Sequence, residues 1–298
     1  MRSYVHGYHE RESQRLNDQA GTLADLLHSD TAYPPGSRVL EAGCGVGAQT
    51  VTLARSSPEA KILSIDISAA SLEQARAKVS AAQLTNVEFM RADLFDAPFE
   101  RESFDHVFVC FVLEHLSKPA EALVALKGLL KPGGTITVIE GDHGSTFFHP
   151  DSDAARDAIA CLVELQRRSA GNAMIGREVY PLLAAAGFDE IWVSPRFVYV
   201  DSTKSGLIDG FTRKTFTAMV EGVREEAIRA GIIDAERFDN GIRALYRTAE
   251  DDGVFCYTFF KGVGKKIAPL SCRRELAARA PAGWEPALHA VRRDVEGD

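Results

Sequence analysis

The chain has 298 residues, of which 45% are apolar and 26% charged, and 34 basic against 42 acidic side chains give a formal net charge of −8. This composition is typical of a folded globular protein and excludes an intrinsically disordered chain. The excess of acidic over basic side chains argues against a general nucleic-acid binder, because such proteins usually have a basic face.

Segments that would direct the chain to a membrane or out of the cell are not found. The longest unbroken apolar stretch, Val107–Leu113, is far shorter than the ~20 residues that a membrane-spanning helix needs. The N-terminal residues are rich in charge and have no apolar core, so they do not resemble a secretory signal. The 5 cysteines are widely spaced without a Cys-x-x-Cys pair, which favours reduced thiols and gives no zinc signature. We therefore expect a cytoplasmic protein with no membrane or nucleic-acid partner.

Strands and helices alternate along the chain with short links. In chain order we first expect a helix over residues 11–28, a strand at Arg38–Glu41, a glycine loop at 43–47 and a helix over 48–56. A strand at Lys61–Asp66, a helix over 69–82 capped by Ser68, strands at Val87–Arg91 and Phe104–Phe111, a helix over 120–130, a turn at 131–134 and a strand at Thr135–Glu140 should follow. The last expected elements are a helix over 175–186 and strands at Ile191–Val200 and Phe255–Lys261. This alternation predicts an α/β fold with a doubly wound, mostly parallel sheet of seven strands.

Two segments are expected to be inserted into this pattern, at residues 143–174 and 205–250, the second of them helical. Because the sheet itself is occupied with packing and cofactor, we expect such insertions to carry substrate contacts.

The glycine loop follows a strand and opens a helix, the setting in which such a loop binds a nucleotide-containing ligand. A dinucleotide site needs Gly-x-Gly-x-x-Gly, and counting from Gly43 the third position is Ala48, so the glycines alone do not exclude NAD. Glu41, just before the loop, would repel a pyrophosphate, whereas it suits a ligand with an ammonium and a sulfonium group. The loop therefore favours S-adenosylmethionine over NAD.

Further carboxylates follow the next two strands. Asp66 ends the second strand, where a carboxylate can accept both ribose hydroxyls of either ligand. Asp93 follows the third strand, where it can accept a hydrogen bond from the adenine amine while Leu94 packs on the ring. The carboxyl end of the fourth strand lies beside the switch point at which ligands bind in such sheets.

Five motifs occur in a fixed order: Val-Leu-Glu-Ala-Gly-Cys-Gly-Val-Gly, Ser-Ile-Asp, Ala-Asp-Leu, Leu-Glu-His-Leu and Leu-Leu-Lys-Pro-Gly-Gly-Thr. Together they resemble the class I S-adenosylmethionine-dependent methyltransferases, above all the small-molecule branch that includes the ubiquinone and menaquinone biosynthesis enzymes. The resemblance covers roughly residues 36–140. It implies a Rossmann-like sheet with an antiparallel last strand, often at the sheet edge, a place that Phe255–Lys261 fits. It also implies methyl transfer to a small molecule, with S-adenosylhomocysteine as the product.

The same resemblance assigns the cofactor contacts. Glu41 and Gly43 would hold the methionine part and Asp66 the ribose. Cys110 and Phe111 would line the pocket through their backbone atoms. The full set of expected cofactor-binding residues is Glu41, Gly43, Cys44, Gly45, Gly47, Asp66, Ile67, Asp93, Leu94, Cys110 and Phe111.

The sequence indicates the residues that would contact the methyl acceptor less clearly than those that would bind the cofactor. His143 follows the fifth strand at the ligand-facing edge, where it could act catalytically as a general base, because its pKa lies near neutrality, or simply structure the loop. In similar methyltransferases an N-terminal helix closes over the active site. We therefore expect residues 1–35 to form a helical lid that brings Tyr4, Tyr8 and Arg15 to the acceptor. No metal is expected, because the pattern of a carboxylate-rich metal site with an asparagine partner is missing.

Residues 36–264 are then the methyltransferase domain and 265–298 a C-terminal tail. Two other interpretations stay open: an NAD-dependent oxidoreductase and a non-catalytic protein that only binds S-adenosylmethionine. A methyltransferase of RNA or protein is disfavoured by the acidic charge and by the lack of an Asn-Pro-Pro-aromatic motif. The sequence leaves the acceptor and its methylated atom open, and a homodimer is possible.

Overall fold

The computed structural model describes residues 20–267, and a seven-stranded sheet of order β3-β2-β1-β4-β5-β7-β6 runs through them. Strands β1 to β5 are mutually parallel, and β7 lies antiparallel between β5 and β6. The strands are β1 Arg38–Ala42, β2 Lys61–Asp66, β3 Val87–Arg91, β4 Phe104–Cys110, β5 Leu130–His149, β6 Asp189–Val200 and β7 Val254–Lys265. The predicted doubly wound, mostly parallel sheet is confirmed.

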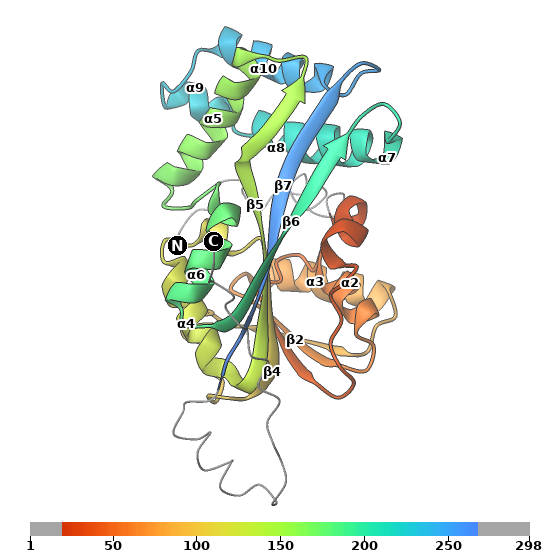
Figure 1. Cartoon of the computed structure of the whole chain (residues 1–298), viewed down its shortest axis with the longest axis vertical. Helices are drawn as coiled ribbons and strands as arrows, with labels where there is room; N and C mark the ends of the chain where they lie inside the picture. Colours follow the sequence, from red (N-terminus) through yellow and green to blue (C-terminus); the bar gives the residue numbers. More distant parts are fainter. Residues whose placement is uncertain (1–19, 268–298) are drawn as a thin grey trace, which may run out of the picture.

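Helices cover both faces of the sheet, with α2 and α3 on one side and α4 and α6 on the other (Figure 1). Residues 20–28 form a further helix, which accounts for the described part of the predicted N-terminal helix. The remaining helices are α2 Thr50–Ser56, α3 Ala69–Ala81, η1 Leu113–His115, α4 Pro119–Leu129, α5 Asp153–Arg168, η2 Ile175–Glu178, α6 Val179–Ala185, α7 Ser205–Leu207, the π-helical η3 Ile208–Thr217, α8 Ala218–Glu221, α9 Arg224–Arg229 and α10 Ala235–Arg247.

Local chemistry explains why these elements begin and end where they do. Strand β4 is apolar almost throughout, and its Phe104, Val107 and Phe108 side chains are fully buried, as expected for a strand covered on both faces. The Ser68 hydroxyl accepts a hydrogen bond of 3.2 Å from the Ser71 amide and so caps α3 as predicted. These strands and caps place the loops that follow β1, β2 and β4 at one edge of the sheet.

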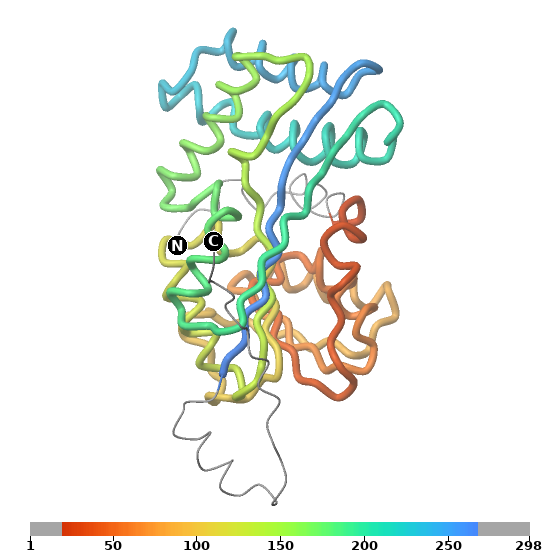
Figure 2. Tube along the Cα trace, viewed as in Figure 1, coloured from red at the N-terminus to blue at the C-terminus, as the bar shows by residue number. Residues whose placement is uncertain are grey.

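Strands β5 and β7 are both longer than the sequence analysis predicted. β5 includes residues 131–134, which were predicted as a turn, and it continues past Glu140 through the first residues of the predicted insertion. Together with β6 and β7 it extends into an upper lobe, where α5, α8, α9 and α10 gather (Figures 1 and 2). The prediction of a strand ending at Glu140 was wrong, because Gly141–Ser145 has a loop-like composition that pairing with β7 overrides.

The position of the last strand also differs from the expectation. β7 was expected at the edge of the sheet, but it lies between β5 and β6, and β6 forms the edge. Pairing on both edges holds β7 inside the sheet, since it bonds antiparallel to β5 on one side and to β6 on the other. Its two faces are also covered: Phe255, Tyr257 and Phe259 are buried on one face and Cys256 on the other.

The helix of residues 20–28 is fastened to the sheet by buried contacts. Its Leu23 and Leu27 pack into the main hydrophobic core. Just beyond it, the Asp30 carboxylate bonds to Lys261 Nζ on β7 at 2.6 Å and pairs with Arg196 on β6.

Tyr4, Tyr8, Arg15 and residues 268–298 lie outside the described residues, so the division into lid, domain and tail stays a prediction. No helix within residues 20–267 is long and apolar enough to cross a membrane.

Candidate active site

The glycine loop joins β1 to α2 at the carboxyl edge of the sheet. The Gly43 and Cys44 amides both donate to Ile65 O of β2, at 2.8 and 3.0 Å, which ties the loop to the neighbouring strand. Gly45 and Gly47 have φ values of +52° and +75°. A Cβ on Gly47 would lie 2.8 Å from Ala75 Cα on α3, whereas a Cβ on Gly45 would meet no atom within 4 Å. Gly47 therefore permits close helix packing, and Gly45 leaves space for a ligand beside the backbone.

Asp66 at the end of β2 organises the loop. Its Oδ2 accepts a hydrogen bond of 2.9 Å from the Gly45 amide, and its Oδ1 accepts one of 2.8 Å from the Ser68 amide. A carboxylate has about four lone-pair sites, so two hydroxyl groups can still bind there. The neighbouring Ile67 side chain is 58% exposed, which places an apolar surface next to the carboxylate.

Glu41 lies beneath the loop, with only 2% of its surface exposed. Its Oε2 accepts hydrogen bonds from the Thr50 hydroxyl at 2.8 Å and from the Ser64 hydroxyl at 2.5 Å. Burial raises the pKa of Glu41 to about 7, and the charge of Asp66 acts in the same direction. The side chain therefore changes charge close to neutral pH.

Two cysteines expected near the cofactor are packed thiols. Burial raises the pKa of Cys44 above its ordinary value, and burial also raises the pKa of Cys110. Neither is a thiolate at neutral pH, which makes both unsuited to act as nucleophiles. Asp93 and Leu94 lie in the loop after β3, where Asp93 Oδ1 accepts a hydrogen bond of 2.9 Å from the Phe95 amide. Asp93 is exposed and Leu94 half-buried.

The loop after β4 is held by Glu140, the last residue of the predicted fifth strand, to which the sequence analysis assigned no role in the site. Glu140 Oε1 accepts hydrogen bonds from the Val112 and Leu113 amides at 3.0 and 2.7 Å. Phe111 just before them has a φ of +57°, a left-handed conformation that costs energy for a bulky residue. Glu140 is fully buried, and its Oε2 has no hydrogen-bond partner among the described residues. An acidic residue in an apolar strand was the available signal for this role.

A bulge in β5 positions His143. Asp142 pairs with Thr258 and Phe147 with Cys256, so residues 143–146 lie opposite the single residue Tyr257 of β7. The bulge is closed by Ser145, whose hydroxyl donates to Asp142 O at 2.7 Å and accepts from the Thr258 amide at 2.9 Å. His143 Nδ1 and the Tyr257 hydroxyl are 2.7 Å apart, and both side chains are buried. Bulges of this kind commonly re-aim side chains next to active sites.

An ion pair anchors the same segment on the other face. Arg177 of η2 makes two hydrogen bonds to the Asp142 carboxylate, Nε to Oδ2 at 2.6 Å and Nη2 to Oδ1 at 2.9 Å. Asp142 Oδ1 also accepts from the Gly144 amide at 2.9 Å. The charge of the buried Asp142 is therefore compensated, and the backbone around His143 is fixed from both sides.

The π-helix η3 packs against this pair. The Phe211 and Phe216 rings lie 5.6 and 5.5 Å from the Tyr257 ring, and Phe216 lies edge-on to His143 at 6.0 Å. π-Helical turns occur often at functional sites. The helix therefore forms an aromatic wall next to His143 and Tyr257.

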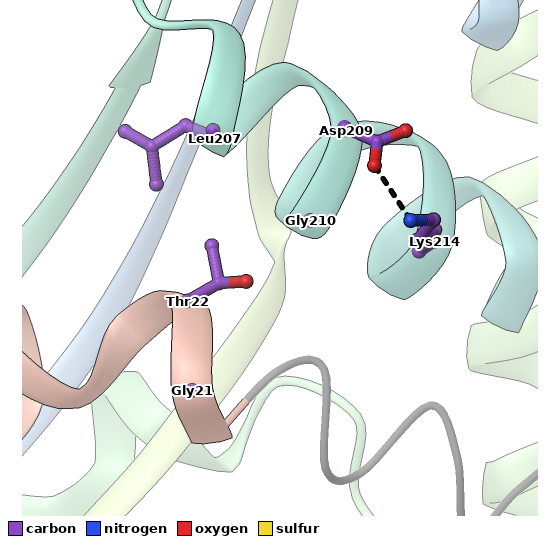
Figure 3. A pocket seen from close by; sticks show the side chains of 7 residues that line it. Gly21, Thr22, Leu207, Asp209, Gly210 and Lys214 are labelled. Atoms are coloured by element: carbon purple, nitrogen blue, oxygen red, sulfur yellow. Dashed lines mark hydrogen bonds and ion pairs between the residues drawn. The ribbon is translucent and has the colours of Figure 1, made fainter.

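On its other side, η3 lines a cavity of about 540 Å³ that also borders the helix of residues 20–28 (Figure 3). Thr22 and Leu207 face each other across it, and Asp209 and Lys214 form an ion pair of 2.6 Å at its rim. The residues that line it are Gly21, Thr22, Gly206, Leu207, Asp209, Gly210 and Lys214. None of them belongs to the expected site.

The structure thus brings Glu41, the glycine loop and Asp66 together, with Cys110 and Phe111 at the adjacent strand end. His143 lies further along the same edge of the sheet. Tyr257 was not predicted as part of the site, because its partner His143 lies 114 residues earlier in the chain and only the fold brings the two together.

Known proteins are similar to this chain over shares of its length that differ from one protein to the next. The methyltransferase domain family model matches residues 39–134. An uncharacterised 37.1 kDa protein from transposon Tn4556 of Streptomyces fradiae is 32% identical over 221 residues, which cover 73% of this chain and 60% of that protein. The demethylmenaquinone methyltransferase of Clavibacter sepedonicus is 36% identical over 124 residues, or 42% of this chain and 48% of that protein. The chain thus spans 60% or less of the length of these relatives.

Solved structures share the fold. A proposed methyltransferase from Bacillus halodurans C-125 is 20% identical with a TM-score of 0.52, covering 83% of this chain and 99% of that one. Phosphoethanolamine N-methyltransferase 2 of Haemonchus contortus, solved with phosphomonomethylethanolamine and S-adenosylhomocysteine, is 17% identical with a TM-score of 0.51 and covers 83% of this chain and 53% of that one. At these identities the likeness concerns the fold alone.

Proposed function

We propose that this chain, which carries a class I S-adenosylmethionine-dependent methyltransferase domain, transfers the methyl group of S-adenosylmethionine to a small-molecule acceptor. The observation that carries the proposal is the arrangement of Glu41, Asp66 and the open space at Gly45 around one loop. A buried carboxylate close to a glycine loop suits a cationic ligand and disfavours the pyrophosphate of NAD.

The residues present fit the cofactor. Asp66 has acceptor sites left for the two ribose hydroxyls, and the exposed Ile67 beside it offers an apolar surface to the adenine ring. Asp93 and Leu94 are assigned to the far side of the adenine, and Glu41 and Gly43 to the methionine part. Cys44, Gly47, Cys110 and Phe111 complete the proposed set.

Bound S-adenosylmethionine would supply an activated methyl group on a sulfonium, which is already a good leaving group. The protein then has mainly to hold the acceptor atom in line with the methyl group at about 3–3.5 Å. Phe111 and the amides of Val112 and Leu113, braced by Glu140, are the rigid backbone at the strand end nearest to this position. His143, in the bulge of β5, is assigned to the acceptor side.

Calorimetric titration tests this proposal. We expect S-adenosylmethionine and S-adenosylhomocysteine to bind the wild-type protein and NAD not to bind. Glu41→Ala should weaken binding by about tenfold or more, because it removes a charge from a low-dielectric site. Glu59→Ala, which removes an exposed carboxylate, is the matched control and should leave affinity unchanged. Binding of NAD alone would overturn the proposal in favour of an oxidoreductase.

Two further points belong to the proposal. We place the protein in the cytoplasm because the cysteines at positions 44, 110, 161 and 256 are free thiols. We also infer that two copies associate through the face of the sheet on which Phe147 of β5 and Phe197 of β6 stack across β7, with ring centroids 5.8 Å apart and both side chains exposed. Sedimentation of the wild-type protein and of Phe197→Ser tests this association. We expect the wild-type protein to sediment as a dimer and the variant as a monomer. A monomeric wild-type protein would exclude the proposed dimer.

A further inference from the structure

The pair formed by His143 and Tyr257 has a preferred direction of hydrogen bonding. The Tyr257 phenol oxygen accepts a backbone hydrogen bond from Asp142, and its other close polar neighbour is His143 Nδ1 at 2.7 Å. Burial, together with the nearby Glu114, Asp142 and Glu140, raises the pKa of Tyr257 well above its ordinary value, so the phenol keeps its proton. A buried hydroxyl donor needs an acceptor, and Nδ1 is the nitrogen in reach.

We propose that Tyr257 is a positioning residue whose hydroxyl donates to His143 Nδ1, so that His143 carries its proton on Nε2 and presents it as a donor to an oxygen of the acceptor. The tautomer of a neutral histidine is set by the hydrogen bond that its other nitrogen makes. Because Nδ1 faces Tyr257, Nε2 lies on the opposite side of the ring. This inference deepens the proposed function and rests on it for the presence of an acceptor beside His143.

The assignment differs from a general base in what it asks of the acceptor. A base would need the opposite tautomer, with the proton on Nδ1 and a free lone pair on Nε2. An Nε2–H donor instead stabilises a carbonyl oxygen or an oxygen that is already ionised when it meets the enzyme. The acceptor class is therefore an oxygen-bearing molecule from which His143 removes no proton.

The surroundings of the pair hold it in one arrangement. On β5, Asp142 is neutralised by Arg177 of η2, and Glu140 is buried with its pKa raised well above the ordinary value, largely by desolvation. Phe216 of η3 packs edge-on against the imidazole. A Cβ on Gly141 would collide with the Tyr257 hydroxyl, so glycine at this position is required for the phenol to reach across β5.

Nitrogen-15 spectra of protein labelled at histidine test the proposal without any acceptor. The two ring nitrogens have different shifts when protonated and unprotonated, and the His143 signal is assigned by its loss in His143→Gln. At pH 7.5 we expect the wild-type protein to show the Nε2–H tautomer. Tyr257→Phe should convert His143 to a mixture of tautomers, because Nδ1 loses its donor.

Two other variants keep the test independent of folding defects. Gly141→Ala should displace the phenol without removing it and shift the tautomer in the same direction. Tyr199→Phe removes an exposed hydroxyl from β6 and should leave the His143 signal unchanged. An Nδ1–H tautomer or a charged ring in the wild type would overturn the proposal. So would an Nε2–H signal that neither Tyr257→Phe nor Gly141→Ala alters.

Titration with S-adenosylhomocysteine separates this inference from the proposed function. We expect Tyr257→Phe and His143→Gln to bind it within about twofold of the wild type, because they lie outside the cofactor loop. If the wild-type protein does not bind it at all, the proposed function fails while the tautomer result still stands. If the tautomer is wrong but binding is normal, only the role of Tyr257 fails.

Discussion

At the scale of single residues, the site depends on a few polar groups that are buried deeply enough to change their chemistry. Glu41, Glu140 and Tyr257 are each removed from solvent, and burial is the largest cause of the raised pKa of each. His28 is the opposite case, because burial lowers its pKa to about 4 and keeps the ring neutral. The pKa values of Glu41 and His28, about 7 and about 4, lie within the pH range in which the protein can be handled.

Cofactor affinity should depend on pH through Glu41. Its pKa of about 7 means that the carboxylate ionises between pH 6 and 8, and the ionised form attracts the cationic cofactor. We expect S-adenosylmethionine to bind about three- to tenfold more tightly at pH 8 than at pH 6, and Glu41→Gln to remove this dependence. Calorimetry at several pH values measures it, and an equal slope in both proteins would contradict the role of Glu41.

The same raised pKa affects the stability of the protein without cofactor. Between pH 4.5 and 7 the unfolded chain has already lost the Glu41 proton while the folded protein retains it. The free energy of unfolding contributed by this residue therefore falls as the pH rises through that range.

His28 should act in the opposite direction. Its Nε2 lies 2.8 Å from Gln49 Oε1, and between pH 6.5 and 4 the unfolded chain binds a proton that the folded protein does not. Stability is therefore lost as the pH falls through this window. From pH 7 to 5 we expect the wild type to lose about 2 kcal/mol more than His28→Gln in urea unfolding. Parallel pH profiles of the two proteins would exclude this effect.

At the scale of elements, the first half of the fold was predictable because its signals are local. β2 and β3 have the predicted bounds, and Ser68 caps α3 through a contact three residues away. The extension of β5 and the partner of His143 depend instead on pairing with β7, more than a hundred residues later. No local pattern marks Gly141–Thr146 as strand, since its residues favour turns when read alone. The glycine loop was therefore accessible from sequence, Glu140 was indicated only as an acidic residue in an apolar strand, and the contact of Tyr257 with His143 was not indicated.

The contact between the glycine loop and α3 gives a test at this scale. A Cβ on Gly47 would overlap the Ala75 backbone, and its φ of +75° is strained for alanine. Gly36 has the same φ but open space around it. We expect Gly47→Ala to cost about 2–4 kcal/mol of unfolding free energy and Gly36→Ala about 1 kcal/mol. Urea unfolding of both variants measures the difference, and equal losses would mean that α3 moves aside freely.

At the scale of the whole molecule, an ionic contact joins the beginning of the described chain to its end. Lys261 Nζ on β7 is 2% exposed and bonds to Asp30 Oδ1 and Thr31 Oγ1 at 2.6 and 2.5 Å. Arg196 on the edge strand pairs with the same aspartate. The contact therefore links the helix of residues 20–28 to the two strands that complete the sheet.

Breaking this contact from its two sides should have unequal effects. Asp30→Asn leaves the buried Lys261 ammonium without its counter-charge, and we expect a loss of about 2–3 kcal/mol, below the fully buried limit because Asp30 is half exposed. Lys261→Met replaces the buried charge with an apolar chain of similar length and should cost about 1 kcal/mol or less. Chemical denaturation compares them, and a larger loss for Lys261→Met would contradict the argument.

The length of β5 and β7 has a consequence for how this protein can be divided. Both strands run from the cofactor half of the sheet into the upper lobe, so any cut between the two parts would sever paired strands in mid-course. The lobe formed around α5, α8, α9 and α10 is thus no separable module that could be exchanged or expressed by itself. We therefore expect the lobe and the rest of the sheet to unfold in one cooperative event. Under the proposed function, a change of acceptor specificity would have to arise by substitution within this shared framework.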